Sequence, residues 1–151
     1  MAKGEYTIRP FESENQAIVQ DLINSGLGDH WGNIDPSMNP DLFDISVTYQ
    51  HDMFLVAWKD NEIIGTGALV HRTHSTGEIV RMTVRREYRR LGIGTRILNA
   101  LIEIAKDCGY RKVILETTKN WNDVINFYRS YGFQITHYTQ EDVYFELNLG
   151  D

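Results

Sequence analysis

The sequence predicts an α/β fold in which a long amphipathic helix connects two strands of a mixed, mostly antiparallel sheet. Three observations predict it: a strand-like run at Glu78–Val84, apolar residues at helical spacing from Ile93 to Cys108, and a continuous apolar run at Val113–Leu115. A strand, a helix and a second strand in this order form a right-handed crossover between parallel neighbours. We therefore expect this strand–helix–strand unit at the centre of the sheet.

Shorter alternating runs and turn residues predict the other elements. The remaining expected strands are Tyr6–Arg9, Met53–Trp58, Ile63–His71, Phe133–His137 and Val143–Leu147. The remaining expected helices are Glu12–Ile23, ending at Gly26 and Gly28, and Asn122–Tyr131, ending at Gly132, with a helical turn within Asp41–Tyr49. Together these elements make a six- to seven-stranded sheet with helices on both faces.

Length and composition predict a single domain over residues 1–151. The chain is 42% hydrophobic and 24% charged, which is typical of a globular protein and too apolar for disorder, and its net charge of −6 argues against nonspecific nucleic-acid binding. The single cysteine, Cys108, excludes an intramolecular disulfide and suits a reducing compartment. There is no apolar run near the ~20 residues of a membrane span and no signal-peptide core. We expect a cytoplasmic protein that binds neither membranes nor nucleic acid.

The charges are distributed unevenly along the chain. Phe11 to Trp58 contains eight acidic residues and no lysine or arginine, whereas Arg81 to Arg96 contains six arginines and one acid. Two ligands of opposite charge would explain this distribution, and so would two solvated faces.

The segment that joins the expected strand Glu78–Val84 to the long helix has the residues of an anion-binding loop. Arg89, Gly92 and Gly94 precede the long helix, where free amides and the helix dipole favour an anion and glycines let it approach the main chain. The segment lacks the third glycine of a dinucleotide-binding fingerprint, because Ile97 stands there, and the chain has no Gly-Lys-Ser/Thr of a Walker A loop.

Arg89-x-x-Gly92-x-Gly94 resembles the Q/R-x-x-G-x-G/A motif of the GNAT superfamily of acetyl-CoA-dependent N-acetyltransferases. A second segment, Asn122–Phe133, is similar to the family's Asn-x-x-Ala-x-x-x-Tyr-type helix followed by Gly-Phe, with Ile125 where alanine is common. The resemblance extends from Tyr6 to about Leu149 and is strongest between Glu78 and Phe133. It implies a GNAT-like fold and an enzyme that moves the acetyl group of acetyl-CoA, its co-substrate, to a primary amine by direct attack in a ternary complex.

The resemblance also implies a cofactor role for the residues that match the motifs. Backbone groups of Met82 and Val84 would pair with the pantetheine arm, amides from Arg90 to Thr95 would hold the pyrophosphate, and Asn122 would bond the far end of the pantetheine. The implied cofactor-binding residues are Met82, Thr83, Val84, Arg89, Arg90, Leu91, Gly92, Ile93, Gly94, Thr95 and Asn122. The side chains of Met82 and Val84 would suit a core strand equally well. For Arg85, Arg86 and Arg96 we expect solvated charges.

Two residues are implied as catalytic by the same resemblance. Tyr128 stands at the position of the general acid, where a phenol protonates the departing thiolate, although an aromatic residue packed in the core would also suit this place. Glu78 is implied as the base that takes a proton from the amine, directly or through water, and it would equally suit a surface glutamate at a strand start.

The acceptor is expected on the acidic N-terminal side, as a small-molecule or peptide amine, cationic in character. The residues expected to line its pocket are Asp29, His30, Trp31, Asp35, Asp41 and Asp44. We expect no metal, because His71 and His74 have no third ligand nearby in sequence, and we expect Cys108 to be buried and unreactive. A homodimer stays open, as do two other functions: a catalytically idle acyl-CoA sensor and an acyltransferase for another acyl-CoA.

Overall fold

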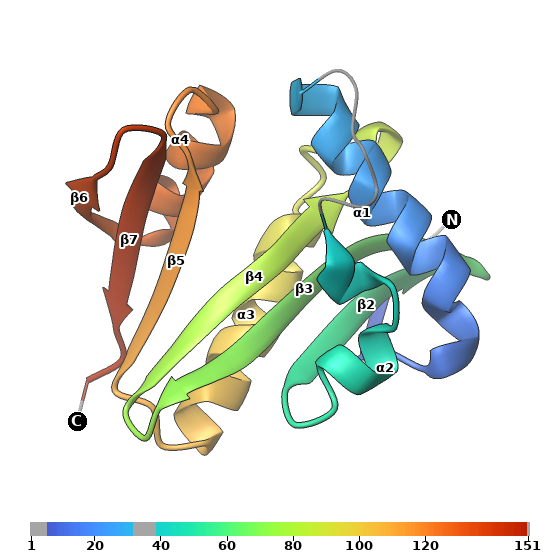
Figure 1. Ribbon diagram of the computed structural model, residues 1–151, viewed down its shortest axis with the longest axis horizontal. Coiled ribbons are helices and arrows are strands. Elements are labelled where there is room, and N and C mark those ends of the chain that lie inside the picture. The colour runs from blue at the N-terminus through green and yellow to red at the C-terminus, as the bar shows by residue number, and fades with distance from the viewer. Residues whose placement is uncertain (1–5, 32–38, 151) are drawn as a thin grey trace.

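The computed structural model describes residues 6–31 and 39–150, with the backbone only for residues 28–31 (Figure 1). In this part of the chain one seven-stranded sheet has the order β1-β2-β3-β4-β5-β7-β6. Every neighbouring pair is antiparallel except β4 and β5, which are parallel. The strands are β1 (Tyr6–Pro10), β2 (Met53–Lys59), β3 (Glu62–Thr73), β4 (Thr76–Val84), β5 (Lys112–Thr118), β6 (Gln134–Tyr138) and β7 (Asp142–Asn148). The mixed, mostly antiparallel sheet is confirmed.

Helices cover both faces of the sheet, as predicted (Figure 1). On one face α3 buries its apolar stripe, including Ile97, Leu98 and Leu101, together with α4. On the other face α1 and the short α2 enclose a second apolar cluster. The helices are α1 (Gln16–Trp31), α2 (Ile45–Thr48), α3 (Ile93–Asp107) and α4 (Asn122–Tyr131), with 3₁₀ turns η1 (Ser13–Asn15), η3 (Pro40–Leu42) and η4 (Arg86–Tyr88). None of the described helices is long and apolar enough to cross a membrane.

The first helix differs from its prediction at both ends. It begins at Gln16, after the η1 turn, and continues through Gly26 and Gly28 instead of ending there. Gly26 lies where α1 crosses β4, and a Cβ at this position would collide with Oγ1 of Thr83. The glycine therefore permits close packing of the helix on the strand, and this role leaves the helix intact.

Strand β4 contains a β-bulge that the sequence does not reveal. Its pairing with β3 shifts between Thr66 and Ala68, and Arg81 adopts a left-handed conformation with φ 57°. The hydroxyl of Thr66, a buried residue, donates to the carbonyl oxygen of Arg81 at 2.7 Å. One extra residue in the strand reverses the alternation of its side chains beyond that point. Ile79 accordingly packs on the α3 side, as does Met82, three positions later.

The two central strands separate soon after they meet. Their ladder comprises Thr76–Lys112, Gly77–Val113 and Glu78–Ile114. Beyond it β4 continues along β3 to Val84 and β5 continues along β7 to Thr118, and the two strands diverge (Figure 1). The sheet therefore opens in its middle, with the inner edge of β4 turned toward the opening.

Cys108 is exposed, so its expected burial is wrong. The apolar stripe of α3 ends with the helix at Asp107, and Cys108 occupies the C-cap before Gly109, which has φ 83°. The chain turns away from the core at this point, so the helical periodicity that predicts burial no longer applies.

Candidate functional site

The opening between β4 and β5 leads to the N-terminus of α3. Between β4 and α3 lies a loop in which Arg90 and Gly92 have positive φ angles of 65° and 85°. The first bond of the helix runs from the amide of Arg96 to the carbonyl of Gly92, at 3.1 Å. The amides of Ile93 and the next two residues precede that bond, and the helix itself does not use them. This arrangement leaves these amides at the end of the opening, and a helix N-terminus of this kind can hold an anion.

Three arginine side chains around this loop bind strand carbonyls. Nε of Arg89 donates to the carbonyl of Val84 at 2.9 Å, and Nε of Arg85 donates to that of Ile63 at 2.8 Å. Arg96 donates to the carbonyl of Tyr6 at 3.0 Å and lies over its ring. Arg85 is half-buried and anchors the strand end to β3, so its charge is not simply solvated, whereas Arg96 is exposed, as expected.

A pocket of about 270 Å³ lies between α1 and the turn that follows β4. Ser25 and Gly26 line it from the helix, and Val84, Arg85 and Arg89 line it from the strand end and the loop. The close approach of α1 to β4 at Gly26 brings these two segments together, and the pocket adjoins the predicted cofactor loop.

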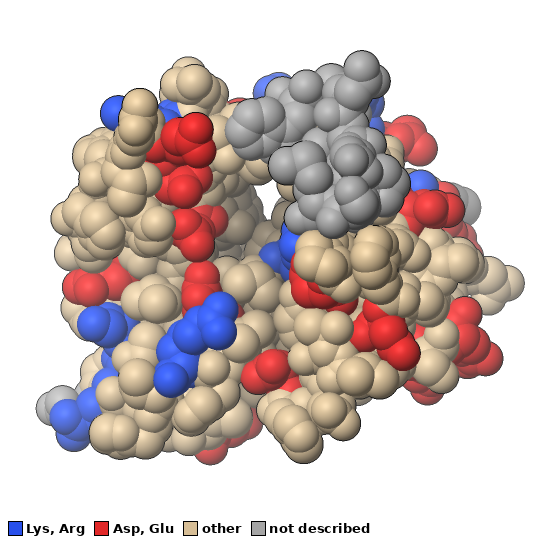
Figure 2. All heavy atoms as spheres, viewed as in Figure 1, with Lys and Arg blue, Asp and Glu red and all other residues tan. Residues whose placement is uncertain are grey.

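Glu78 occupies the last residue pair of the β4–β5 ladder, at the point where the strands separate. Its side chain is 13% exposed and its Oε1 lies 2.6 Å from Nε of Arg72. A second pocket, of about 250 Å³, is lined here by Asp41, Tyr49, Glu78, Ile79, Val80, Arg81 and Glu116. Three carboxylates and one arginine therefore surround the pocket, and Figure 2 shows acidic groups along the β5 side of the opening.

Tyr128 lies on α4 with its ring in an aromatic cluster. Its ring centroid is 5.1 Å from that of Phe127, 5.7 Å from Phe133 and 5.8 Å from Phe145. The residue is 6% exposed, and this burial raises the pKa of the phenol above its ordinary value. The phenol therefore stays protonated, which is the state that a general acid requires. Tyr131 on the same helix instead donates to Oδ1 of Asn99 at 2.6 Å.

The two sequence motifs meet in space. A Cβ at Gly94, in the first motif, would lie 3.4 Å from Cζ of Phe127, in the second. Asn122 is the first residue of α4 and is exposed, where the chain enters this helix after β5. The N-termini of α3 and α4 thus both follow strands that border the opening.

The residues expected to line the pocket of the amine acceptor lie in different places. Asp41 lines the pocket beside Glu78, whereas Asp44 is an N-cap whose Oδ1 accepts from the amide of Val47 at 3.3 Å. Asp35 lies outside the described residues, as do the side chains of Asp29, His30 and Trp31.

The sequence did not predict the partners of Asp41, which are Arg81 and Tyr49, or that Asn39 accepts from the same Arg81 guanidinium. Arg81 belongs to the arginine cluster, but only the bulge directs its side chain to the α2 side of the sheet. A bulge at a residue other than glycine leaves no signal in the sequence.

Comparison with known proteins agrees with this architecture. The family model described as the acetyltransferase (GNAT) family matches residues 19–133. N-acetyltransferase 8 of Rattus norvegicus is 30% identical over 118 residues, which cover 72% of this chain and 53% of that protein. The chain spans about half the length of the curated relatives it matches first.

Solved structures share the fold over nearly the whole chain. An acetyltransferase of the GNAT family from Staphylococcus aureus Mu50 has a TM-score of 0.88 at 22% identity, covering 96% of this chain and 99% of that one. A GNAT family acetyltransferase from Elizabethkingia anophelis with acetyl-CoA bound has a TM-score of 0.74 at 24% identity, covering 95% and 98%. At such identities the likeness concerns the fold.

Proposed function

Because the chain belongs to the acetyltransferase (GNAT) family, we propose that it moves the acetyl group of acetyl-CoA to a primary amine by direct attack in a ternary complex. One observation carries this proposal: β4 and β5 separate after Glu78, and the opening leads to the amides at the start of α3. An extended pantetheine arm suits the free edge of a strand, and a pyrophosphate suits a helix N-terminus. The acetyl-CoA bound to the Elizabethkingia anophelis protein supports this choice of co-substrate.

The proposed cofactor contacts use the main chain. Backbone groups of Met82, Thr83 and Val84 would pair with the pantetheine arm, because this part of β4 lies beyond the ladder with β5. The amides from Arg90 to Thr95 would hold the pyrophosphate. The bond from Arg89 to the carbonyl of Val84 joins the strand end to the loop, so both contacts belong to one rigid turn.

The proposed chemistry places the base and the acid on opposite sides of the opening. Glu78 takes a proton from the amine, directly or through water, while Arg72 holds its carboxylate in place. The neutral amine nitrogen bonds the acetyl carbon, the carbon–sulfur bond breaks, and Tyr128 gives its phenolic proton to the departing sulfur. The nitrogen then loses its second proton to solvent and becomes the amide nitrogen. Both groups regain their resting states by proton exchange with solvent.

The acceptor we propose is a cationic amine, either a small molecule or a peptide. Among the described residues that line the pocket, Asp41, Glu78 and Glu116 bring three carboxylates and Arg81 brings one cation. Arg72 pairs with Glu78 from outside this lining. This excess of negative charge favours a positively charged group over a neutral or acidic one.

The experiment that tests this function follows thiol release from acetyl-CoA in the presence of polyamines, lysine peptides and neutral aryl amines. We expect release with the cationic amines. Acetyl-CoA that raises the melting temperature without release by any amine would favour an acyl-CoA sensor, and faster release from propionyl- or succinyl-CoA would favour another acyl donor.

The role of Glu78 has its own test, in the pH dependence of kcat/KM. Glu78→Gln is expected to lower kcat/KM by about 10²-fold or more and to remove the acidic limb of the profile, because an amide cannot take the proton. Glu103→Gln, an exposed change on α3, is the matched control. An acidic limb that persists in Glu78→Gln would assign the base to another group.

A further inference from the structure

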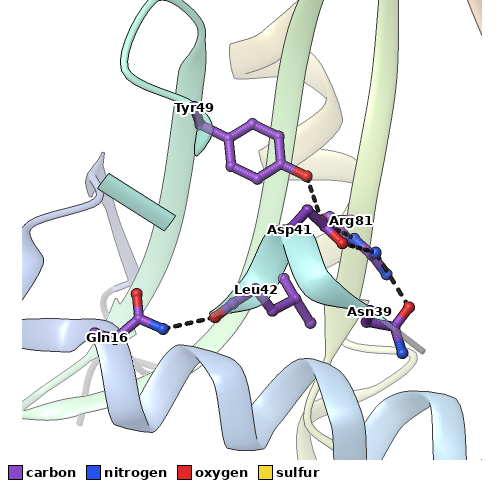
Figure 3. Close-up of polar contacts among 6 residues, drawn as sticks. All are labelled: Gln16, Asn39, Asp41, Leu42, Tyr49 and Arg81. Atoms are coloured by element: carbon purple, nitrogen blue, oxygen red, sulfur yellow. Dashed lines mark hydrogen bonds and ion pairs between the residues drawn. The ribbon is translucent and has the colours of Figure 1, made fainter. Parts of the chain in front are cut away.

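Arg81 on β4 makes a two-pronged contact with Asp41 of the η3 turn (Figure 3). Its Nε lies 2.9 Å from Oδ2 and its Nη2 lies 2.6 Å from Oδ1 of that carboxylate. Nη2 also lies 3.2 Å from Oδ1 of Asn39. Guanidinium and carboxylate meet here in the paired geometry that fixes both orientation and distance.

Tyr49 completes this contact from the end of α2. Its hydroxyl donates to Oδ2 of Asp41 at 2.6 Å (Figure 3). Burial alone would raise the pKa of Asp41, but the hydrogen bonds from Arg81 and Tyr49 and the charge of Arg81 lower it below its ordinary value. Burial and the carboxylate of Asp41 raise the pKa of Tyr49 to about 12. At neutral pH the unit therefore consists of an arginine cation, a carboxylate and a neutral phenol.

The segment from Asn39 to Tyr49 is held at two places. At one, the side chain of Gln16 on α1 donates to the carbonyl of Leu42 at 2.6 Å and accepts from the amide of Ile45 at 2.9 Å. At the other, Arg81 ties the segment to β4. Gln16 anchors the segment to a helix, whereas Arg81 anchors it to the strand that carries Glu78.

Arg81, Asp41 and Tyr49 line the same pocket as Glu78. We propose that Arg81 is a positioning residue that fixes the segment Asn39–Tyr49 against β4 and thereby sets the affinity for the amine acceptor. This inference rests on the proposed function, because it concerns the amine that Glu78 would deprotonate. The side chain of Arg81 points to the α2 side, away from the α3 side on which Met82 packs, so acetyl-CoA binding should not depend on it.

The left-handed backbone at Arg81 allows its side chain to be tested separately from the bulge. Glycine adopts φ 57° without strain, so Arg81→Gly removes the side chain and preserves the bulge. Asp41→Asn keeps the shape of the partner and removes its charge. The double variant then reports whether the two residues act as one unit.

The experiment measures kcat and both KM values for Arg81→Gly, Asp41→Asn and the double variant, with the best amine of the panel. Each single change is expected to raise the amine KM about tenfold and to leave the acetyl-CoA KM within twofold. The double variant is expected to have the same amine KM as each single variant. Arg81→Lys should recover part of the loss, because it keeps the charge without the two-pronged geometry. Lys112→Gln, which breaks the ion pair to Glu146 between β5 and β7, is the control and should change neither KM.

Three results would overturn the inference: an unchanged amine KM, an equal rise in both KM values, or a lower amine KM in Arg81→Gly. The last would mean that Asp41, once released, binds the amine itself. A wild-type chain that acetylates no amine would instead disprove the proposed function, and this outcome differs from an active wild type whose variants keep their amine KM.

Discussion

Tyr128 has an environment that keeps its phenol protonated. Its ring is enclosed by Phe127, Phe133 and Phe145, and burial raises the pKa of its hydroxyl. A departing thiolate, with an ordinary thiol pKa of about 8.5, requires a donor that is still protonated at neutral pH. The same burial makes Tyr128 a core residue, so its structural role and its proposed catalytic role are compatible.

Tyr128→Phe tests the proposed proton donation directly. Phenylalanine fills the same aromatic site but has no proton to donate, so we expect kcat to fall by about 10²-fold with the acetyl-CoA KM nearly unchanged. Tyr131→Phe, on the same helix, loses its bond to Asn99 and serves as the control that should keep kcat. Equal effects of the two changes in steady-state kinetics would show that only packing is involved.

Among the features of the strands and helices, the bulge in β4 most affects the candidate site. It places Arg81 on the α2 side and returns Met82 to the α3 side. Gly67 of β3 lies opposite the bulge, where a Cβ would come within 2.6 Å of Sδ of Met82 and 2.7 Å of Cγ2 of Ile97. The glycine thus gives the bulged strand and α3 the room to pack.

Gly67→Ala is expected to lower the free energy of unfolding by about 1–3 kcal/mol, because the methyl group overpacks a filled core. Urea denaturation measures this change. Gly94→Ala is the matched control, since its Cβ would lie 3.4 Å from the ring edge of Phe127 and 3.9 Å from Cγ2 of Val84, and alanine favours a helix. Similar losses for the two variants would mean that the bulge imposes no special demand on Gly67.

At the scale of the whole molecule, two parts of one sheet are joined at its centre by a short ladder. β1 to β4 carry α1 and α2, while β5 to β7 carry α4, and α3 connects the parts. The Arg81–Asp41 ion pair stabilises the first part close to the point where the parts separate. Its contribution depends on pH through the carboxylate.

The pH dependence has a definite sign. The pKa of Asp41 is lower in the folded protein than in the unfolded chain, so its stabilising effect is complete above the unfolded pKa of about 3.9 and is lost as the pH falls below it. Asp41→Asn should therefore be less stable than the wild type at pH 7, and this difference should shrink toward about pH 3. Urea unfolding across this range measures it, and a constant difference would contradict the lowered pKa.

Local patterns were sufficient for most of the elements. The apolar period of α3, the continuous run of β5 and the glycine loop between β4 and α3 all predicted what the structure contains. Prediction failed where a residue acts through a distant neighbour. Gly26 suggests a helix end until Thr83 is found beneath it.

The order of the elements, the family and the loop at the start of α3 could be predicted from the sequence, because each depends on residues close together in the chain. Which charged side chains meet beside Glu78 depends instead on tertiary packing. Asp41 and Arg81 are far apart in sequence, and they pair because a bulge reverses the alternation of β4 and Gln16 holds the segment after η3 in place. The acidic N-terminal stretch and the arginine cluster thus share one ion pair beside Glu78, a contact that depends on the packing of α2 against the sheet.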